Sequence, residues 1–180
     1  MVIADRRALA LITTIALAAT LSACSSTDES VSLTDTKGPT QLLRNDAASR
    51  VPHEALLTVG EKGDAPVACA LEDDPDKLFQ KWQSSIVLEI NSSFAPTVGQ
   101  MSADLSAAYA ADGWDEFLSE GDGSSTRTLK KNGSRSELII QTTEDTDGDG
   151  LGATIAIDVL GQCVKTAGPE SDEVIKLGTR

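Results

Sequence analysis

The sequence is poor in aromatic residues, histidine and cysteine. Aromatic side chains make up 3% of the 180 residues, His53 is the only histidine, and there are three cysteines. Metal sites built from clustered His and Cys ligands are therefore disfavoured, as is thiol–disulfide exchange, because no Cys-x-x-Cys pair occurs. The chain also lacks the Gly-x-Ser-x-Gly nucleophile motif and a phosphate-binding Gly-rich loop that ends in Lys-Ser or Lys-Thr. We expect no cofactor.

Basic residues are few relative to acidic ones. The chain has 15 Lys and Arg against 28 Asp and Glu, which gives a formal net charge of −13. Nucleic-acid phosphates and anionic lipid headgroups repel such a chain. We therefore expect no nucleic-acid partner and no electrostatic attachment to a membrane surface.

The N-terminus has the three parts of an export signal. Arg6 and Arg7 follow Asp5, and residues 8–23 carry no charge and are mostly Ala, Leu and Ile. A basic start, an apolar core and small residues form a secretory signal. The apolar run is shorter than the ~20 residues of a membrane span, although an uncleaved anchor is the alternative. The residues after the arginines fit the twin-arginine pattern poorly, which favours the general secretory route.

Leu21-Ser22-Ala23-Cys24 ends this signal and resembles the lipobox of bacterial lipoproteins. The resemblance implies cleavage after the signal peptide of residues 1–23 and attachment of a diacylglycerol to Cys24. Two acyl chains are enough for stable anchoring, here at the outer face of the cell membrane. Residues 24–38 would then be the lipidated cysteine and a flexible tether, because the stretch is rich in Ser, Thr and Asp.

Two cysteines remain once Cys24 is assigned to the lipid. Outside the cytoplasm such a pair usually forms a disulfide, so we predict a bridge between Cys69 and Cys163. Two free buried thiols are the alternative.

Trp82 and Trp114 have two possible roles. The favoured one is packing in the core, and the alternative is stacking on a sugar or peptide.

Hydrophobic periodicity after residue 78 predicts five strands and one helix. Residues 86–90 alternate in polarity, and Pro96 begins a helix that runs to about Asp112, with Gly113 as its C-terminal cap. Further strands are expected at 114–118, 125–131, 135–144 and 152–163, with turn residues between them.

This order predicts an α+β fold in a single domain over residues 39–165. We expect an antiparallel sheet of about four or five strands with one main helix packed on one face (β-α-β-β-β-β), preceded by a helical or extended segment from Pro39. Residues 166–180 are expected to be a polar tail. With Cys24, Gly113-Trp114 and Cys163, the pattern resembles small extracytoplasmic lipoproteins of high-GC Gram-positive bacteria, most of which have no known activity.

The favoured function is non-enzymatic binding or scaffolding of an unidentified envelope ligand or protein, with no catalytic residue assigned. The alternative is a small envelope hydrolase or transferase that uses carboxylates such as Glu116, Glu120 or Glu137 as acid and base. That chemistry needs one carboxyl group shielded from water. Two carboxylates that converge in a cleft would favour the enzyme.

An aspartate-rich stretch is the one candidate for a metal site. Asp145, Asp147 and Asp149, followed by Gly150, match the first half of an EF-hand calcium loop. The twelfth position, counted from Asp145, is Ala156, where a bidentate Glu is required. A turn is therefore favoured, and the three aspartates are weak candidates as metal ligands.

Overall fold

The computed structural model describes residues 31–121, 124–145 and 153–178. These residues form three α-helices, a 3₁₀ turn and seven strands. In chain order the elements are α1 (Leu33–Ser49), η1 (His53–Ala55), β1 (Leu56–Ala68), β2 (Phe79–Ile90), α2 (Val98–Ala111), β3 (Asp115–Gly121), β4 (Ser124–Lys130), β5 (Glu137–Thr143), β6 (Thr154–Leu160), β7 (Val164–Lys165) and α3 (Asp172–Gly178).

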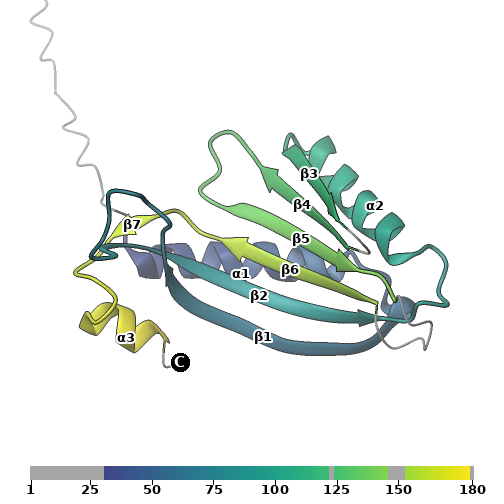
Figure 1. Cartoon of the computed structure of the whole chain (residues 1–180), viewed down its shortest axis with the longest axis horizontal. Helices are drawn as coiled ribbons and strands as arrows, with labels where there is room; N and C mark the ends of the chain where they lie inside the picture. Colours follow the sequence, from purple (N-terminus) through teal and green to yellow (C-terminus); the bar gives the residue numbers. More distant parts are fainter. Residues whose placement is uncertain (1–30, 122–123, 146–152, 179–180) are drawn as a thin grey trace, which may run out of the picture. The chain divides into compact units, whose positions relative to one another are not determined.

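The strands form one antiparallel sheet in the order β1-β2-β6-β5-β4-β3, and the short β7 pairs with the start of β2 (Figure 1). Strands β3 to β6 follow one another as a meander. The last of them, β6, lies beside β2 and joins the meander to the β1–β2 hairpin. Each hairpin at an edge of the sheet is preceded by a helix: α1 comes before β1–β2, and α2 comes before β3–β4.

Helix α1 begins at a capping box. The Ser32 hydroxyl accepts a hydrogen bond from the Asp35 amide at 3.3 Å, and the Asp35 carboxylate accepts one from the Ser32 amide at 2.9 Å. The expected start at Pro39 is therefore wrong, because the helix continues through this proline. Residues 33–38, which we expected in the tether, form the first turns of α1.

Helix α2 agrees closely with the predicted helix. Thr97 caps its N-terminus by accepting a hydrogen bond from the Gln100 amide. At its C-terminus Gly113 adopts a left-handed conformation (φ +84°), and the Trp114 amide donates to the Tyr109 carbonyl at 3.1 Å. The two rings of Tyr109 and Trp114 also meet edge to face, with centroids 5.6 Å apart. This is a Schellman motif with its usual hydrophobic contact.

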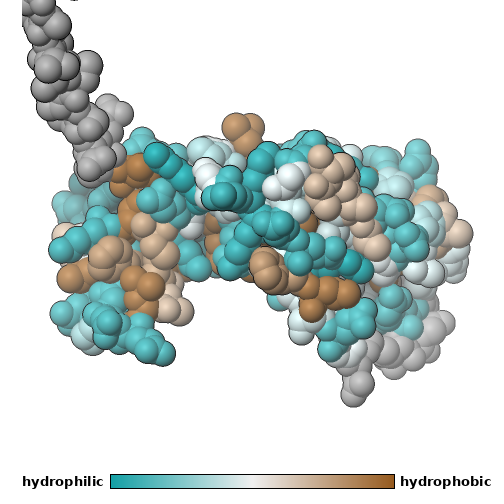
Figure 2. Space-filling view, turned by 90° about the horizontal axis from the view of Figure 1, so that it is seen from above, coloured by the Kyte–Doolittle hydropathy of each residue, from teal (hydrophilic) through white to brown (hydrophobic). Residues whose placement is uncertain are grey.

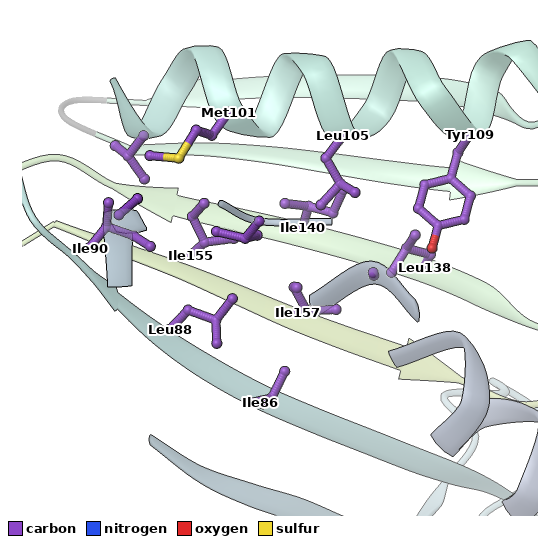
Figure 3. Close-up of a cluster of buried hydrophobic side chains, with 14 of the residues drawn as sticks. Ile86, Leu88, Ile90, Met101, Leu105, Tyr109, Leu138, Ile140, Ile155 and Ile157 are labelled. Atoms are coloured by element: carbon purple, nitrogen blue, oxygen red, sulfur yellow. The ribbon is translucent and has the colours of Figure 1, made fainter. Parts of the chain in front are cut away.

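Both long helices pack on the same face of the sheet. Ala47 near the end of α1 belongs to the same buried cluster as Met101, Leu105 and Tyr109 of α2. In Figure 3 the α2 side chains point toward the isoleucines and leucines of β2, β5 and β6. Alternate residues of these strands are buried, as expected for a sheet covered on one face.

A second buried cluster lies near the end of the β1–β2 hairpin at which the two strands are connected. Leu33 of α1, Trp82 of β2, Val164 of β7 and Val174 of α3 form it. Next to it Cys69 and Cys163 are joined, with Sγ atoms 2.05 Å and Cα atoms 6.2 Å apart. The predicted disulfide is confirmed.

The α+β class and the antiparallel sheet are confirmed, whereas two finer expectations are wrong. The described residues contain seven strands, not four or five, and two long helices cover the sheet, not one. Strand β1 lies in the segment that we expected to be helical or extended, and it adds a strand to the sheet that had not been counted. Gly60, Gly63 and Pro66 weaken the strand pattern of its sequence. The expected polar tail contains α3, whose Val174 is buried.

Candidate functional site

The structure separates the three carboxylates that we considered for catalysis. Glu116 and Glu120 lie on the side of β3 that faces the helices, because they pair across the sheet with Leu129 and Ser125. Glu137 is on the opposite face of β5 and forms an ion pair with Lys130 at 3.3 Å. Glu137 therefore cannot work together with the other two.

Glu120 lines a polar groove between α2 and the ends of three strands, which we call the α2–β3 groove. Its volume is about 460 Å³. The first turns of α2 form one wall, and the helix-facing side of β3, β4 and β5 forms the floor. The lining residues are Gly99, Gln100, Ala103, Glu120, Gly121, Ser124, Ser125, Arg127, Thr142 and Glu144.

Negative charge predominates in and beside this groove. Arg127 is the one cation of the lining, and its guanidinium forms an ion pair with Glu116 on the neighbouring strand. Glu120 and Glu144 have no ion-pair partner among the described residues. Gly99 leaves room for one of them, because a β-carbon at that position would lie 3.3 Å from the Glu144 Oε1 atom. In the part of the chain that the structure describes, the groove therefore has two carboxylates without an ion-pair partner that a ligand could contact.

The two groove carboxylates lack the shielding from solvent that acid–base catalysis usually needs. Glu120 and Glu144 are both exposed to solvent. A catalytic carboxyl group that must hold a proton near neutral pH is usually desolvated. The remaining lining groups are hydroxyls, an amide and small side chains, for example the Ser125 and Thr142 hydroxyls, which hydrogen-bond each other at 2.7 Å. These groups are suited to binding a polar or cationic ligand.

The floor of the groove ends at an exposed edge strand. β3 is the last strand of the sheet and pairs with β4 alone among the described strands. All seven of its residues are exposed, including Phe117 at 60% and Leu118 at 48%. Figure 2 views the protein from the side on which α2 and β3 lie in Figure 1, and hydrophobic side chains are visible there among hydrophilic ones.

The other edge of the sheet is built differently. The pairing of β1 with β2 has register shifts between Leu56 and Thr58 and between Val59 and Lys62, and the strand contains Pro66. Helix α3 also contacts β1. Bulges, proline, lysine and a covering helix are the common means of preventing strand pairing at an edge. β3 contains no bulge, proline or lysine, and its register with β4 is continuous from Asp115 to Gly121. Its protection against pairing with other strands is negative charge, from Asp115, Glu116 and Glu120.

A smaller cavity of about 210 Å³ lies between α1 and α2 and is lined by Arg50, Pro52, Pro96, Met101, Asp104, Leu105 and Ala108. Beside it the Tyr109 hydroxyl donates to the Asp46 carboxylate at 2.6 Å, and Arg50 donates to the same carboxylate at 3.0 Å. The bond from Tyr109 lowers the pKa of Asp46, although burial opposes it. These polar groups satisfy one another, so we interpret them as a link between the two helices.

The other residues that were singled out from the sequence and that the structure describes do not line the groove. Trp82 is fully buried, and Trp114 packs against the main core, which agrees with the core role. Asp145 accepts a hydrogen bond from the Ser92 hydroxyl at 3.1 Å. Cys24, Asp147 and Asp149 lie outside the described residues. Within the described part of the chain, no group of three or more His, Cys, Asp or Glu side chains is placed to hold a metal ion.

Comparison with known proteins gives no relative: no protein-family model, curated protein or solved structure matches this chain. None of the helices that the structure describes is long and apolar enough to cross a membrane.

Most of the residues that line the groove were not singled out from the sequence. Of its charged residues only Glu120 had been considered, while Arg127 and Glu144 had not. The alternation in Asp-Glu-Phe-Leu-Ser-Glu-Gly does place Glu116, Leu118 and Glu120 on one face of a strand. What the alternation does not reveal is that this strand lies at the edge of the sheet, which depends on β6 pairing with β2.

Proposed function

We propose that the protein is a lipid-anchored, non-enzymatic binding module at the outer face of the cell membrane, and that it binds its ligand in the α2–β3 groove. The observation that carries the binding function is the exposed, acidic edge strand β3 beside a polar groove, whose Glu120 and Glu144 have no ion-pair partner among the described residues. The main-chain N–H and C=O groups on the free side of an edge strand are a template for pairing with another chain.

The lipid anchor is supported by the lipobox resemblance at Leu21-Ser22-Ala23-Cys24 and by its position behind a basic start and an apolar run. Residues from Val31 onward form one compact unit, and α1 begins at Leu33. Eight residues, 25–32, therefore separate Cys24 from α1. A lipid on Cys24 would therefore tie the protein to the cell envelope. The ligand is then expected to belong to the envelope.

The non-enzymatic part of the proposal is supported by the exposure of Glu120 and Glu144. The sequence also has no Gly-x-Ser-x-Gly nucleophile motif, and His53, its only histidine, is exposed in η1 and does not line the groove. A groove with exposed carboxylates, hydroxyls and an amide has the means to recognise a ligand but lacks a desolvated acid or base.

Site-specific photo-crosslinking in cells that naturally make the protein tests this function. A photoreactive residue is placed at Gln100, which is exposed and lines the groove. The control carries the same residue at Glu72, in the exposed connection between β1 and β2 at the opposite edge of the sheet. We expect one discrete adduct from position 100 and none of that mass from position 72. Equal labelling from both positions, or no adduct from position 100, would contradict binding in the groove.

A further inference from the structure

We propose that the ligand of the α2–β3 groove is an extended, cationic peptide segment of another protein, which pairs antiparallel with β3 and adds a strand to the sheet. This inference rests on the proposed function and identifies the partner of the same site. Addition to a sheet edge obtains its affinity from main-chain hydrogen bonds and its specificity from the side chains opposite the new strand.

The backbone of β3 is available for this pairing. In an antiparallel pair every second residue directs its N–H and C=O groups toward the partner strand, so the alternate residues of β3 direct theirs away from β4. The continuous register with β4 keeps these groups in a regular row over seven residues. A peptide of the same length can pair with the whole row.

The side chains of β3 specify what lies opposite them. Glu120 and Leu118 face the helices, and Phe117 faces the other side of the sheet. Residues directly opposite in an antiparallel pair share a face and interact. A basic residue opposite Glu120 would enter the groove, where Glu144 is the second unpaired carboxylate. Apolar residues opposite Leu118 and Phe117 would cover these two exposed side chains.

Glu116 does not require a second basic residue, because Arg127 already forms an ion pair with it. The preferred segment, written from its N-terminus to its C-terminus, is therefore a basic residue opposite Glu120, any residue opposite Ser119, and two apolar residues opposite Leu118 and Phe117. Gly99, Gln100 and Ala103 form the flank of α2 beside the groove. Glycine has no side chain and that of alanine is a single methyl group, so Gly99 and Ala103 leave space for the long stem of a lysine or arginine.

A second copy of the chain is a poor occupant of the same edge. If two β3 strands paired antiparallel with full overlap, Glu116 of each would stand directly opposite Glu120 of the other. Like charges opposite each other in a sheet are destabilising, and each chain carries a formal net charge of −13. The same charges attract a basic segment. The acidic edge thus disfavours self-association and favours a cationic partner.

The binding test uses the full chain in detergent and the capped peptide Thr-Lys-Thr-Val-Val-Thr-Thr, which sets lysine opposite Glu120 and the two valines opposite Leu118 and Phe117. We expect a dissociation constant below about 1 mM by fluorescence anisotropy. Hydrogen exchange of residues 115–121 should slow when the peptide is added, while that of residues 56–68 in β1 should not change. The peptide with glutamate in place of lysine should bind roughly three- to tenfold more weakly.

A charge exchange tests the contact with Glu120. The variant Glu120→Lys should prefer the glutamate peptide to the lysine peptide, whereas the matched control Glu72→Lys should keep the original preference. Circular dichroism checks that both variants fold, as expected for exposed side chains without an ion-pair partner. Two peptides N-methylated at alternate residues test the backbone pairing, because only one set of amides can face β3. One of them should fail to bind.

Several results would overturn strand addition: no binding of the lysine peptide, equal binding of both N-methylated peptides, or an unchanged preference in Glu120→Lys. Sedimentation that shows a dimer disrupted by Leu118→Lys would identify the second copy as the occupant. If the crosslink at position 100 forms in cells while the peptide tests fail, strand addition is wrong but the binding function remains. If the crosslink also fails, both are wrong.

Discussion

A single aspartate, Asp64 of β1, is hydrogen-bonded both to α1 and to the neighbouring strand β2. Its carboxylate accepts hydrogen bonds from Arg44 at 2.8 Å, from the Ser84 hydroxyl and from the Trp82 indole at 3.4 Å. The Arg44 side chain is only 4% exposed. A buried guanidinium that has lost its carboxylate partner lowers the stability of the fold. The fold therefore depends on Asp64 to compensate the buried charge of Arg44.

The protonation of Asp64 should make stability depend on pH. Burial would raise the pKa of this carboxyl group, but the hydrogen bonds from Ser84, Arg44 and Gln41 outweigh it and hold the pKa below its usual value. The unfolded chain releases this proton near pH 4. The stabilisation by the ionised group is therefore complete above about pH 4 and is lost as the pH falls through the lower pKa of the folded state.

Replacement of Asp64 by asparagine should lower the free energy of unfolding by about 3 kcal/mol at pH 7, because it leaves the Arg44 charge buried and unpaired. Urea unfolding followed by circular dichroism between pH 3 and pH 7 measures the effect. We expect the difference between wild type and Asp64→Asn to shrink below pH 4, since only the wild type loses a charge there. Asp73→Asn, in an exposed connection, is the control and should change little. A difference that grows in acid would contradict this role.

The glycine after α2 should also be sensitive to substitution. Gly113 has φ +84°, and a β-carbon added there would meet nothing within 4 Å. Gly113→Ala therefore introduces no clash, and its cost is the left-handed backbone alone, about 1 kcal/mol of unfolding free energy. Gly113→Asn should cost less, because asparagine tolerates this conformation better. Equal stability of the alanine variant and the wild type in urea would show that the cap does not limit stability.

At the scale of elements, the strands with clean alternation were predictable and the segments with mixed signals were not. β5, β6 and helix α2 were placed to within a few residues, because their apolar residues recur with the period of their structure. β2 was found only in its second half. Its first half buries Gln80 and Ser84 beside Trp82, and buried polar residues hide the alternation.

Helix α1 shows the same limit more strongly. Its buried side includes Thr36, Thr40 and Arg44, so the residues that face the sheet do not form an apolar stripe in the sequence. The sequence did carry a usable signal in Ser32-Leu33-Thr34-Asp35, which has the spacing of a capping box. The expected helix began instead at Pro39, and Ser32 to Asp35 were assigned to the tether. The partners that make these polar residues tolerable, such as Asp64 and Ser84, lie far away in sequence.

The candidate site was predictable only in part for a related reason. Glu120 could be named from the sequence, but the groove needs α2, three strands and Glu144 at once. The strand that lies at the edge of the sheet is determined by the long-range pairing of β2 with β6. No local pattern reports that pairing, because the two strands are separated by more than sixty residues.

The disulfide joins elements that are remote in the chain, and its loss should therefore be costly. Cys69 follows β1 and Cys163 precedes β7, with a sequence separation of 94. In the chain-entropy model a loop of this size contributes up to roughly 4.7 kcal/mol. We expect the double variant Cys69→Ser/Cys163→Ser to unfold at markedly lower urea concentration than the wild type. Added reductant should destabilise the wild type but leave the variant unchanged. Two free thiols in the denatured, unreduced wild type would contradict the bridge.

For the whole molecule, the charge and the expected anchor support each other. A chain with a net charge of −13 is repelled by anionic headgroups. Its folded unit is therefore not expected to adhere to the membrane by itself, and the acidic groove and edge strand remain accessible to a partner. Retention at the membrane would depend on the acyl chains attached through Cys24.

This dependence gives a direct prediction for Cys24→Ala. In cells grown with a labelled fatty acid, the wild type should carry the label and stay with the membranes after a high-salt wash, because two acyl chains give stable anchoring that salt does not screen. Cys24→Ala should lose the label and appear in the soluble fraction. The control Ser25→Ala changes the adjacent residue and should behave like the wild type. Membrane retention of unlabelled Cys24→Ala would instead identify residues 8–23 as an uncleaved anchor.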